Sequence, residues 1–231
     1  MFKWLRNFFK RPVDGSAGAP QLPGTNSMWI PAAENEFGID ILDCSAFCQS
    51  MISSSDDLRI AATFAQLRSS LGEKYRDKTP ANAKSADCDL TYPYDGQHSN
   101  GALFKAQEME DKWDIYHYDS KIYFARSWTG DLIFVADVVF TPDCVRLISV
   151  TADAVRAVDS AYAIASVDYL MKSHIYRRLI PHPLPQDHTN DPYQIACFSF
   201  GQYGRFAGFA SFEDTTQIKI PVRRPNSEGD A

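Results

Sequence analysis

Residues 113–152 read WDIYHYDSKIYFARSWTGDLIFVADVVFTPDCVRLISVTA, and this stretch decides the fold. Four runs of branched aliphatic and aromatic residues follow one another within it, separated by turn-forming residues at 119–120, 129–131 and 142–143. Connections this short join neighbouring strands that run in opposite directions. The stretch therefore predicts four consecutive strands of an antiparallel meander sheet.

One helix is expected before this stretch and one after it. Residues 55–71 begin at Ser55 as a cap and carry a set of apolar positions assigned to an inward face: Leu58, Ala61, Ala62, Phe64, Leu67 and Leu71. Residues 161–180 carry an apolar stripe that includes His174 as a core residue and ends before Pro181. The expected fold is α+β, with a central antiparallel meander sheet of about five to six strands packed against at least two helices.

The remaining segments add shorter elements. Residues 37–44 form a short extended run, and residues 195–200 and 215–222 are expected to add two strands to the central sheet. Residues 73–100 are rich in charge, Pro and Gly, which predicts a long surface excursion with a single strand.

Composition divides the chain into four parts. Residues 1–11 form a basic amphipathic arm, residues 12–27 a flexible linker, residues 28–222 a single α+β domain, and residues 223–231 a disordered tail. A chain of 231 residues is long enough for one hydrophobic core.

The arm separates aromatic from basic side chains when it is drawn as a helix. Its apolar side carries Phe2, Trp4, Leu5, Phe8 and Phe9, and its polar side carries Lys3, Arg6, Asn7, Lys10 and Arg11. Such a helix binds an anionic membrane surface or lies in a groove of a partner protein. The alternative is that the arm docks on its own domain or frays.

Charge and cysteine usage restrict partners and location. A net charge of −6 and a pI near 5.3 do not favour phosphate binding, so no nucleic acid is expected. Five cysteines without a CxxC pair predict free thiols and a cytoplasmic location, with peripheral attachment at the inner face of the membrane through the arm as an extension. No stretch approaches the roughly 18 apolar residues of a spanning helix.

Neither a cofactor nor a metal is expected. A Pro-rich loop places His182, Asp187, His188 and Asp191 close together in sequence, but it lacks the helical spacing that supports a metal centre. The glycines of residues 201–208 match neither common phosphate-binding pattern.

Two groups of residues are candidates for ligand or partner binding. The string Arg126-Ser127-Trp128-Thr129 lies where one predicted strand turns into the next, and a cation beside an indole and two hydroxyls suits a small anion. The alternative is that Trp128 closes the end of the core while Arg126 pairs with a carboxylate. Tyr116 and Tyr118 share one strand face, which either recognises a protein or lies beneath a second helix.

The preferred function is a non-catalytic, bacterial-type intracellular protein-binding domain with an inhibitor or immunity-like role. It rests on the acidic charge, the aromatic side chains, the amphipathic arm and the lack of any assembled catalytic motif. The alternative is an enzyme that acts on a small anionic substrate in a cleft near Arg126 and Trp128, with His98 or His117 transferring the proton.

Overall fold

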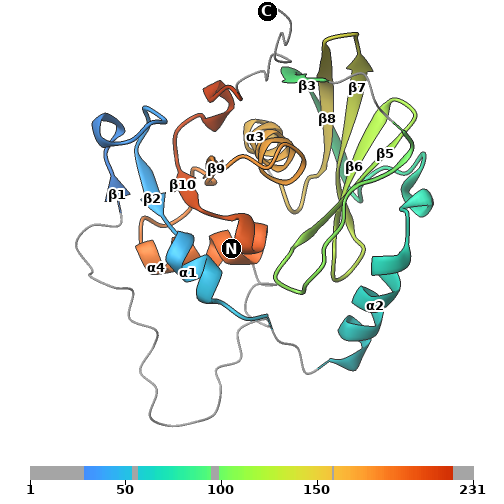
Figure 1. Cartoon of the computed structure of the whole chain (residues 1–231), viewed down its shortest axis with the longest axis horizontal. Helices are drawn as coiled ribbons and strands as arrows, with labels where there is room; N and C mark the ends of the chain where they lie inside the picture. Colours follow the sequence, from blue (N-terminus) through green and yellow to red (C-terminus); the bar gives the residue numbers. More distant parts are fainter. Residues whose placement is uncertain (1–28, 54–56, 95–98, 158, 221–231) are drawn as a thin grey trace, which may run out of the picture.

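The computed structural model describes residues 29–53, 57–94, 99–157 and 159–220. Two sheets and four α-helices make up this part of the chain (Figure 1). The larger sheet is antiparallel with the strand order β3-β8-β7-β6-β5-β4, and the smaller sheet has the order β1-β2-β10-β9. The predicted α+β class with a central antiparallel meander is confirmed.

The large sheet is built around the predicted meander. Its strands are β3 (Ala83–Pro93), β4 (Gly101–Phe104), β5 (Trp113–Tyr118), β6 (Lys121–Arg126), β7 (Leu132–Phe140) and β8 (Cys144–Asp153). The strands from β5 to β8 are neighbours in chain order. The β5–β6 turn holds Asp119 at φ 58°, a left-handed conformation that Asp tolerates better than most residues.

Both edge strands of the large sheet lie in or next to the segment 73–100. The single strand expected within this segment is confirmed as β3, but this strand is 11 residues long, so more of the segment belongs to the sheet than a surface excursion implies. This strand pairs with β8 from Ala83 opposite Asp153 to Pro93 opposite Cys144. Its sequence is polar because most of its side chains are exposed or half-buried, as befits an edge strand.

The small sheet joins segments from both ends of the described chain. It contains β1 (Trp29–Ile30), β2 (Ile41–Asp43), β9 (Pro181–Pro183) and β10 (Phe209–Ser211). Strand β10 lies between β2 and β9; it is antiparallel to β2 and parallel to β9. The extended run predicted for residues 37–44 is confirmed in β2. Strand β9 was not predicted, because it contains proline, which has no backbone N–H to donate to a neighbouring strand and therefore argues against a strand.

The α-helices are α1 (Ser45–Ser50), α2 (Leu58–Ser69), α3 (Ser160–Leu170) and α4 (Pro192–Tyr203). A π-helical turn, η4 (Met171–Ile175), continues α3, and 3-10 turns lie at η2 (Ala32–Glu34), η3 (Glu73–Tyr75), η5 (Gly204–Phe206) and η6 (Thr215–Gln217). The predicted helix of residues 161–180 is therefore confirmed as far as Ile175. In the described part of the chain, none of the helices has the length and hydropathy that crossing a membrane requires.

Residues 195–200, predicted as a strand, lie in α4 instead. The Asp191 carboxylate accepts a hydrogen bond from Gln194 N, and Pro192 occupies the first turn, where its missing N–H is not needed. The helix is buried on most sides, so its sequence carries no helical period. The strand predicted for residues 215–222 is also wrong over its described part, which consists of η6 and three residues without strand pairing.

The main core lies between the large sheet and a layer formed by α3, α4 and the small sheet (Figure 1). Helix α3 lies between the two sheets and contacts β9 on one side and β3 and β8 on the other. A smaller core lies on the opposite face of the large sheet, beneath α2 and η3, and consists of Tyr75, Tyr116, Tyr118, Tyr123, Ala125 and Val135. The large sheet is therefore covered on both faces.

Helix α2 buries less of its predicted inward face than expected. Phe64 and Leu67 are buried, whereas Leu58 is 85% exposed and Leu71 60% exposed. Ala61 and Ala62 are exposed as well. The helix touches the sheet with its C-terminal half, so the apolar positions of its first turns face solvent.

Candidate functional site

Arg126 lies at the end of β6, and its guanidinium donates hydrogen bonds to backbone carbonyls at the C-terminal end of α4. Nη1 donates to the carbonyl of Gln202 and Nη2 to that of Gly201, both at 2.8 Å. Cζ lies 4.8 Å from the centroid of the Trp113 ring. Burial and, to a smaller extent, the charge of Arg156 lower the pKa of Arg126 to about 10. The group is therefore a cation at neutral pH, placed at the negative end of α4.

The residues after Arg126 hold the segment 105–112. Ser127 Oγ donates to the carbonyl of Asp111 and Trp128 Nε1 to that of Met109, both at 2.7 Å. Thr129 Oγ1 accepts a hydrogen bond from a backbone N–H within its own turn. The four candidate side chains thus contact three separate segments. This arrangement agrees with the alternative in which they close the end of the core, with backbone carbonyls in place of the expected carboxylate.

Tyr116 and Tyr118 are buried, at 0% and 6% exposure. The Tyr116 ring lies against Gly72, where an added Cβ would fall 2.2 Å from a ring atom, and Tyr118 Oη donates to the carbonyl of Leu71 at 2.9 Å. Of the two alternatives for this strand face, the covering helix is the observed one. These two rings therefore form part of the interior.

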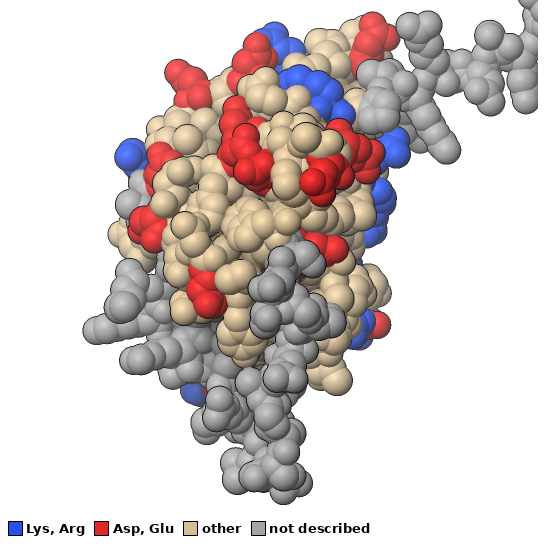
Figure 2. Space-filling model, turned by 90° about the vertical axis from the view of Figure 1, so that its left-hand side faces the viewer, with Lys and Arg blue, Asp and Glu red and all other residues tan. Residues whose placement is uncertain are grey.

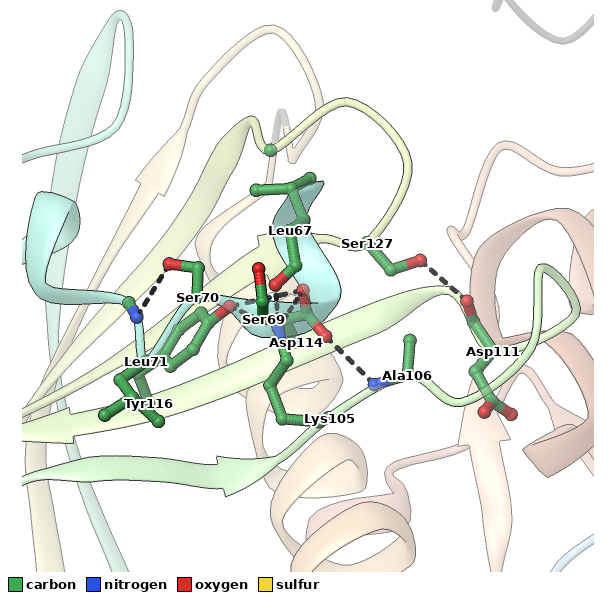
Figure 3. A network of polar contacts seen from close by, with 12 residues as sticks. Leu67, Ser69, Ser70, Leu71, Lys105, Ala106, Asp111, Asp114, Tyr116 and Ser127 are labelled. Atoms are coloured by element: carbon green, nitrogen blue, oxygen red, sulfur yellow. Dashed lines mark hydrogen bonds and ion pairs between the residues drawn. The ribbon is translucent and has the colours of Figure 1, made fainter. Parts of the chain in front are cut away.

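Asp114 is the centre of the polar contacts under α2 (Figure 3). Its Oδ2 lies 2.9 Å from Lys105 Nζ, which also donates to Tyr116 Oη and to the carbonyl of Leu67, each at 2.8 Å. Asp114 Oδ1 accepts a hydrogen bond from Ala106 N at 2.9 Å. The three protons of the Lys105 ammonium therefore have three acceptors, one of them a carboxylate.

Of the two histidines proposed for proton transfer, His117 is the one that lies within the described residues. The ring nitrogens of His117 lie 3.1 Å from the carbonyl of Ser99 and 2.7 Å from that of Asp119. His98 lies outside the described residues. The core position predicted for His174 is confirmed, because its side chain is 1% exposed, and burial lowers its pKa to about 3.

The Pro-rich loop directs its polar side chains to different places. His182 is buried in β9 with Nε2 2.9 Å from Ser199 Oγ, while the Asp191 carboxylate caps α4 and Asp187 is exposed. Across the described ranges, no three His, Cys, Asp or Glu side chains are placed to hold a metal ion. The loop residues thus serve packing, helix capping and the surface.

Exposed carboxylates gather on the layer of the small sheet. We define the acidic surface as Glu34, Glu36, Asp40, Asp187, Asp191, Glu213 and Asp214, all of which are exposed. Asp40 N donates to Glu213 Oε1 at 2.7 Å, which joins segments from near the two ends of the described chain. Figure 2 shows Asp and Glu side chains across the middle of this face, with Lys and Arg at its top and along both side rims. Within the described parts of 29–57 and 179–218, Arg205 is the only Lys or Arg.

An aromatic side chain lies next to one of these carboxylates. Tyr193, close to Asp191 in the first turn of α4, is 43% exposed. The Tyr193 ring packs edge-on against Phe47 with 5.9 Å between centroids. An exposed aromatic ring held beside carboxylates is typical of a protein interface.

A further polar site, which no sequence motif marks, joins the end of α1 to the start of β5. Lys112 Nζ donates to Ser53 Oγ at 2.6 Å and to the carbonyl of Met109 at 2.9 Å. Lys112 is 6% exposed, and Ser53 is half-buried. The one local signal in the sequence is a lysine directly before the buried Trp113. Nothing in the sequence pairs this lysine with a serine so far away in the chain.

The surroundings of Lys112 disfavour its protonated form. Both hydrogen-bond acceptors are neutral, and the rings of Trp128 and Phe200 lie 4.4 and 4.5 Å from Nζ. Burial lowers the pKa of Lys112 to about 7; the charge of Arg126 adds to this effect, and that of Glu110 opposes it. A ring face attracts a cation, but it does not replace the water that burial removes.

The arm of residues 1–11, with all its aromatic and basic side chains, lies outside the described residues. Comparisons with protein-family models, with curated proteins and with solved structures found no match to this chain. The chemistry of the surfaces and buried sites described above therefore carries the functional argument.

Proposed function

We propose that this chain is a protein-binding domain with an inhibitor or immunity-like role, and that the acidic surface binds a basic partner protein. The supporting observation is that seven exposed carboxylates gather on the small-sheet layer, where Arg205 is the only Lys or Arg within the described parts of 29–57 and 179–218, and the exposed Arg177, Arg178 and Lys219 lie directly outside these ranges. A surface of one charge speeds the encounter with a partner of opposite charge and sets its orientation.

The acidic surface is held in shape before any partner arrives. The hydrogen bond from Asp40 N to Glu213 Oε1 ties the β1–β2 loop to the turn after β10, and Asp191 is fixed as the cap of α4. Tyr193 supplies an exposed ring for the centre of an interface, because aromatic side chains contribute large contact areas with little entropy loss. A preformed surface avoids part of the ordering cost of association.

The contacts of Arg126 and Trp128 favour protein binding over the enzyme alternative. The guanidinium and the indole N–H are directed to backbone carbonyls of Gln202, Gly201 and Met109. A pocket for a small anionic substrate needs donors that face the substrate. The candidate donors instead stabilise α4 and the segment 105–112.

The basic arm of residues 1–11 is the second binding element in the proposed function. Residues 1–11 carry four cations, whereas the domain carries the acidic surface. We place the protein in the cytoplasm with the arm at the anionic inner face of the membrane. Repulsion between the acidic surface and anionic lipids would then turn that surface toward the cytoplasm and the partner.

The test is capture of a partner from native lysate by the full-length chain and by a variant in which three carboxylates of the acidic surface are replaced by amides. The triple variant Glu34→Gln, Glu36→Gln and Glu213→Gln keeps the side-chain shapes and removes three charges. We expect the wild-type chain to capture a basic protein, identified by mass spectrometry, and the variant to bind it about tenfold more weakly, since three exposed charge contacts contribute about 0.5 kcal/mol each.

A matched variant, Glu73→Gln, Asp77→Asn and Asp87→Asn, removes three exposed charges from the other side of the molecule and should bind as the wild type does. Equal binding by both triple variants, or no captured basic protein, would overturn the proposal for the acidic surface. For the arm, the full-length variant Lys3→Glu, Arg6→Glu and Lys10→Glu should no longer sediment with anionic vesicles; unchanged sedimentation contradicts the membrane contact.

A further inference from the structure

Ser53 and Lys112 present a hydroxyl and an amine to each other at the junction of α1, β5 and α4. Their Oγ and Nζ atoms lie 2.6 Å apart, which is hydrogen-bond distance for a proton transfer. Ser53 keeps partial access to solvent, whereas Lys112 is 6% exposed. This is the arrangement of a reachable nucleophile in front of a buried base.

Both residues are held by rigid neighbours. The backbone N of Ser53 donates to Glu110 Oε1 at 2.8 Å, and Glu110 is 7% exposed. A Cβ added at Gly204 would lie 1.8 Å from the carbonyl oxygen of Glu110. The segment before β5 is therefore packed directly against the backbone at the end of α4. The second hydrogen bond of Nζ, to Met109, orients the amine.

The amine has the character that a general base needs. With a pKa of about 7, roughly half of the Lys112 side chains are unprotonated at neutral pH. The lone pair of the unprotonated amine then accepts the Ser53 proton. The Trp128 and Phe200 rings beside Nζ keep water away from the amine.

A buried hydrogen-bond donor belongs to the turn after α4, whose backbone contacts α1. Arg205 Nε is buried and has no acceptor among the described residues. The carbonyl of Arg205 accepts a hydrogen bond from Gln49 Nε2 of α1, and the charge of Arg205 is one of the causes that lower the pKa of Lys112. The same guanidinium is fixed through Nη1 by an ion pair with Glu108. A buried N–H without an acceptor is suited to a substrate oxygen that becomes negative.

We propose that Ser53 and Lys112 form a nucleophile and base pair that transfers the acyl group of small carboxylic esters. Ser53 Oγ bonds to the ester carbonyl carbon while its proton moves to Lys112 Nζ, and Arg205 Nε–H binds the carbonyl oxygen. Collapse of the tetrahedral adduct breaks the ester C–O bond, and the leaving alkoxide takes the proton from Lys112. Water repeats the sequence on the acylated serine and releases the carboxylic acid.

This activity goes beyond the proposed protein binding, because none of its residues belongs to the acidic surface. The experiment treats the full-length protein with a small alkyl fluorophosphonate, which phosphonylates activated serines: an O–P bond forms at Ser53, the P–F bond breaks and fluoride leaves. Intact mass spectrometry and peptide mapping then measure the adduct. We expect a single adduct at Ser53, formed at a rate that rises with pH and is half-maximal near 7.

The variants assign the roles. Ser53→Ala should abolish labelling, and Lys112→Met should slow it by about 100-fold or more, the usual contribution of a general base. Ser50→Ala is the matched control, because its hydroxyl donates to the carbonyl of Phe47 one turn away and should leave labelling unchanged. Circular dichroism confirms that each variant is folded.

Three results would overturn the proposal. The first is no adduct at Ser53 in the wild-type protein at pH 8, and the second is an adduct at Ser53 that forms at the same rate in folded Lys112→Met. If that variant does not fold, the pH profile of the wild-type protein decides. A labelling rate that is flat between pH 6 and 8 is then the third.

Discussion

Two lysines at the ends of the segment 105–112 enter the interior with different partners. Lys105 lies under α2, where its ammonium has the Asp114 carboxylate at 2.9 Å and two further acceptors. Lys112 lies at the end of α1, where its acceptors are the hydroxyl of Ser53 and a carbonyl. In the first cluster a carboxylate contacts the ammonium directly and offsets the loss of water, whereas in the second both direct acceptors of the lysine are neutral.

The difference separates stability from reactivity. The Lys105 ammonium donates to the carbonyl of Leu67 while it contacts the Asp114 carboxylate, and it thereby links α2 to the sheet. A buried amine whose direct hydrogen-bond acceptors are neutral has its pKa lowered to about 7, chiefly by burial and despite the opposing charge of Glu110, and becomes a base under ordinary conditions. The two ends of one short segment therefore serve different purposes, and three substitutions test the contrast.

The largest effect is expected for Asp114→Asn. The substitution leaves the Lys105 ammonium buried without its carboxylate, which typically lowers the free energy of unfolding by about 3–5 kcal/mol. Urea denaturation measures the loss. Asp119→Asn is the control, because Asp119 pairs with Arg76 at a position where both side chains are about half exposed, and such a pair is worth under about 1 kcal/mol. Equal losses in the two variants would remove the contrast.

A pH-dependent effect is expected for Lys112→Met. The pKa of Lys112 in the folded chain is about 7, below the ordinary 10.5, so between these values the unfolded chain binds more protons than the folded chain. The free energy of unfolding of the wild type should therefore rise with pH through this window and level off below about 7. Relative to Lys112→Met, the wild type should gain about 2–3 kcal/mol from pH 7 to pH 9.

Urea denaturation of both proteins at pH 7, 8 and 9 measures this gain. Lys121→Met, which removes a half-exposed lysine from its pair with Asp137, measures how the free energy of unfolding depends on pH when an ordinary surface lysine is lost. Parallel curves for wild type and Lys112→Met would mean that the amine is not destabilised as a cation in the folded chain.

The smallest effect is expected for Ser127→Ala. The hydroxyl of Ser127 donates to the carbonyl of Asp111, between the two lysines in the chain, and the loss of one such bond costs about 1 kcal/mol. Ser85→Ala, which removes an exposed hydroxyl contact with Thr151, should cost less than half as much. A thermal melt series resolves the two. A larger loss in Ser127→Ala than in Asp114→Asn would show that the backbone of the segment matters more than its charges.

The meander was predictable because its pairings are local. Each strand lies next to its partner in the sequence, and turn residues such as Asp119 and Gly130 mark the hairpins. The small sheet was not predictable, because pairings such as Leu42 with Ala210 join remote positions. Helix α4 was read as a strand because burial on most sides hides its period, and Asp191-Pro192 was the one local sign of a helix start.

The candidate sites follow the same rule. The string at Arg126 and Trp128 was noticed because its residues are adjacent, but adjacency does not show whether the donors face a ligand or the backbone of another segment. Ser53 and Lys112 carry no motif, and only the packing of α1 against the segment before β5 brings them together. The acidic surface likewise combines two halves of the chain, which hydropathy alone does not place side by side.

The pairing of β10 with β2 and β9 sets an order of assembly during synthesis. The large sheet consists of residues 83–153, so a nascent chain can form it while the rest is still being translated. The small sheet lacks its central strand until Phe209–Ser211 has left the ribosome. Strand β2 can pair with β1 early, but its other edge has no partner until β10 has been synthesised. A ribosome that stalls before residue 209 would therefore carry a chain with its large sheet complete and its acidic surface unassembled.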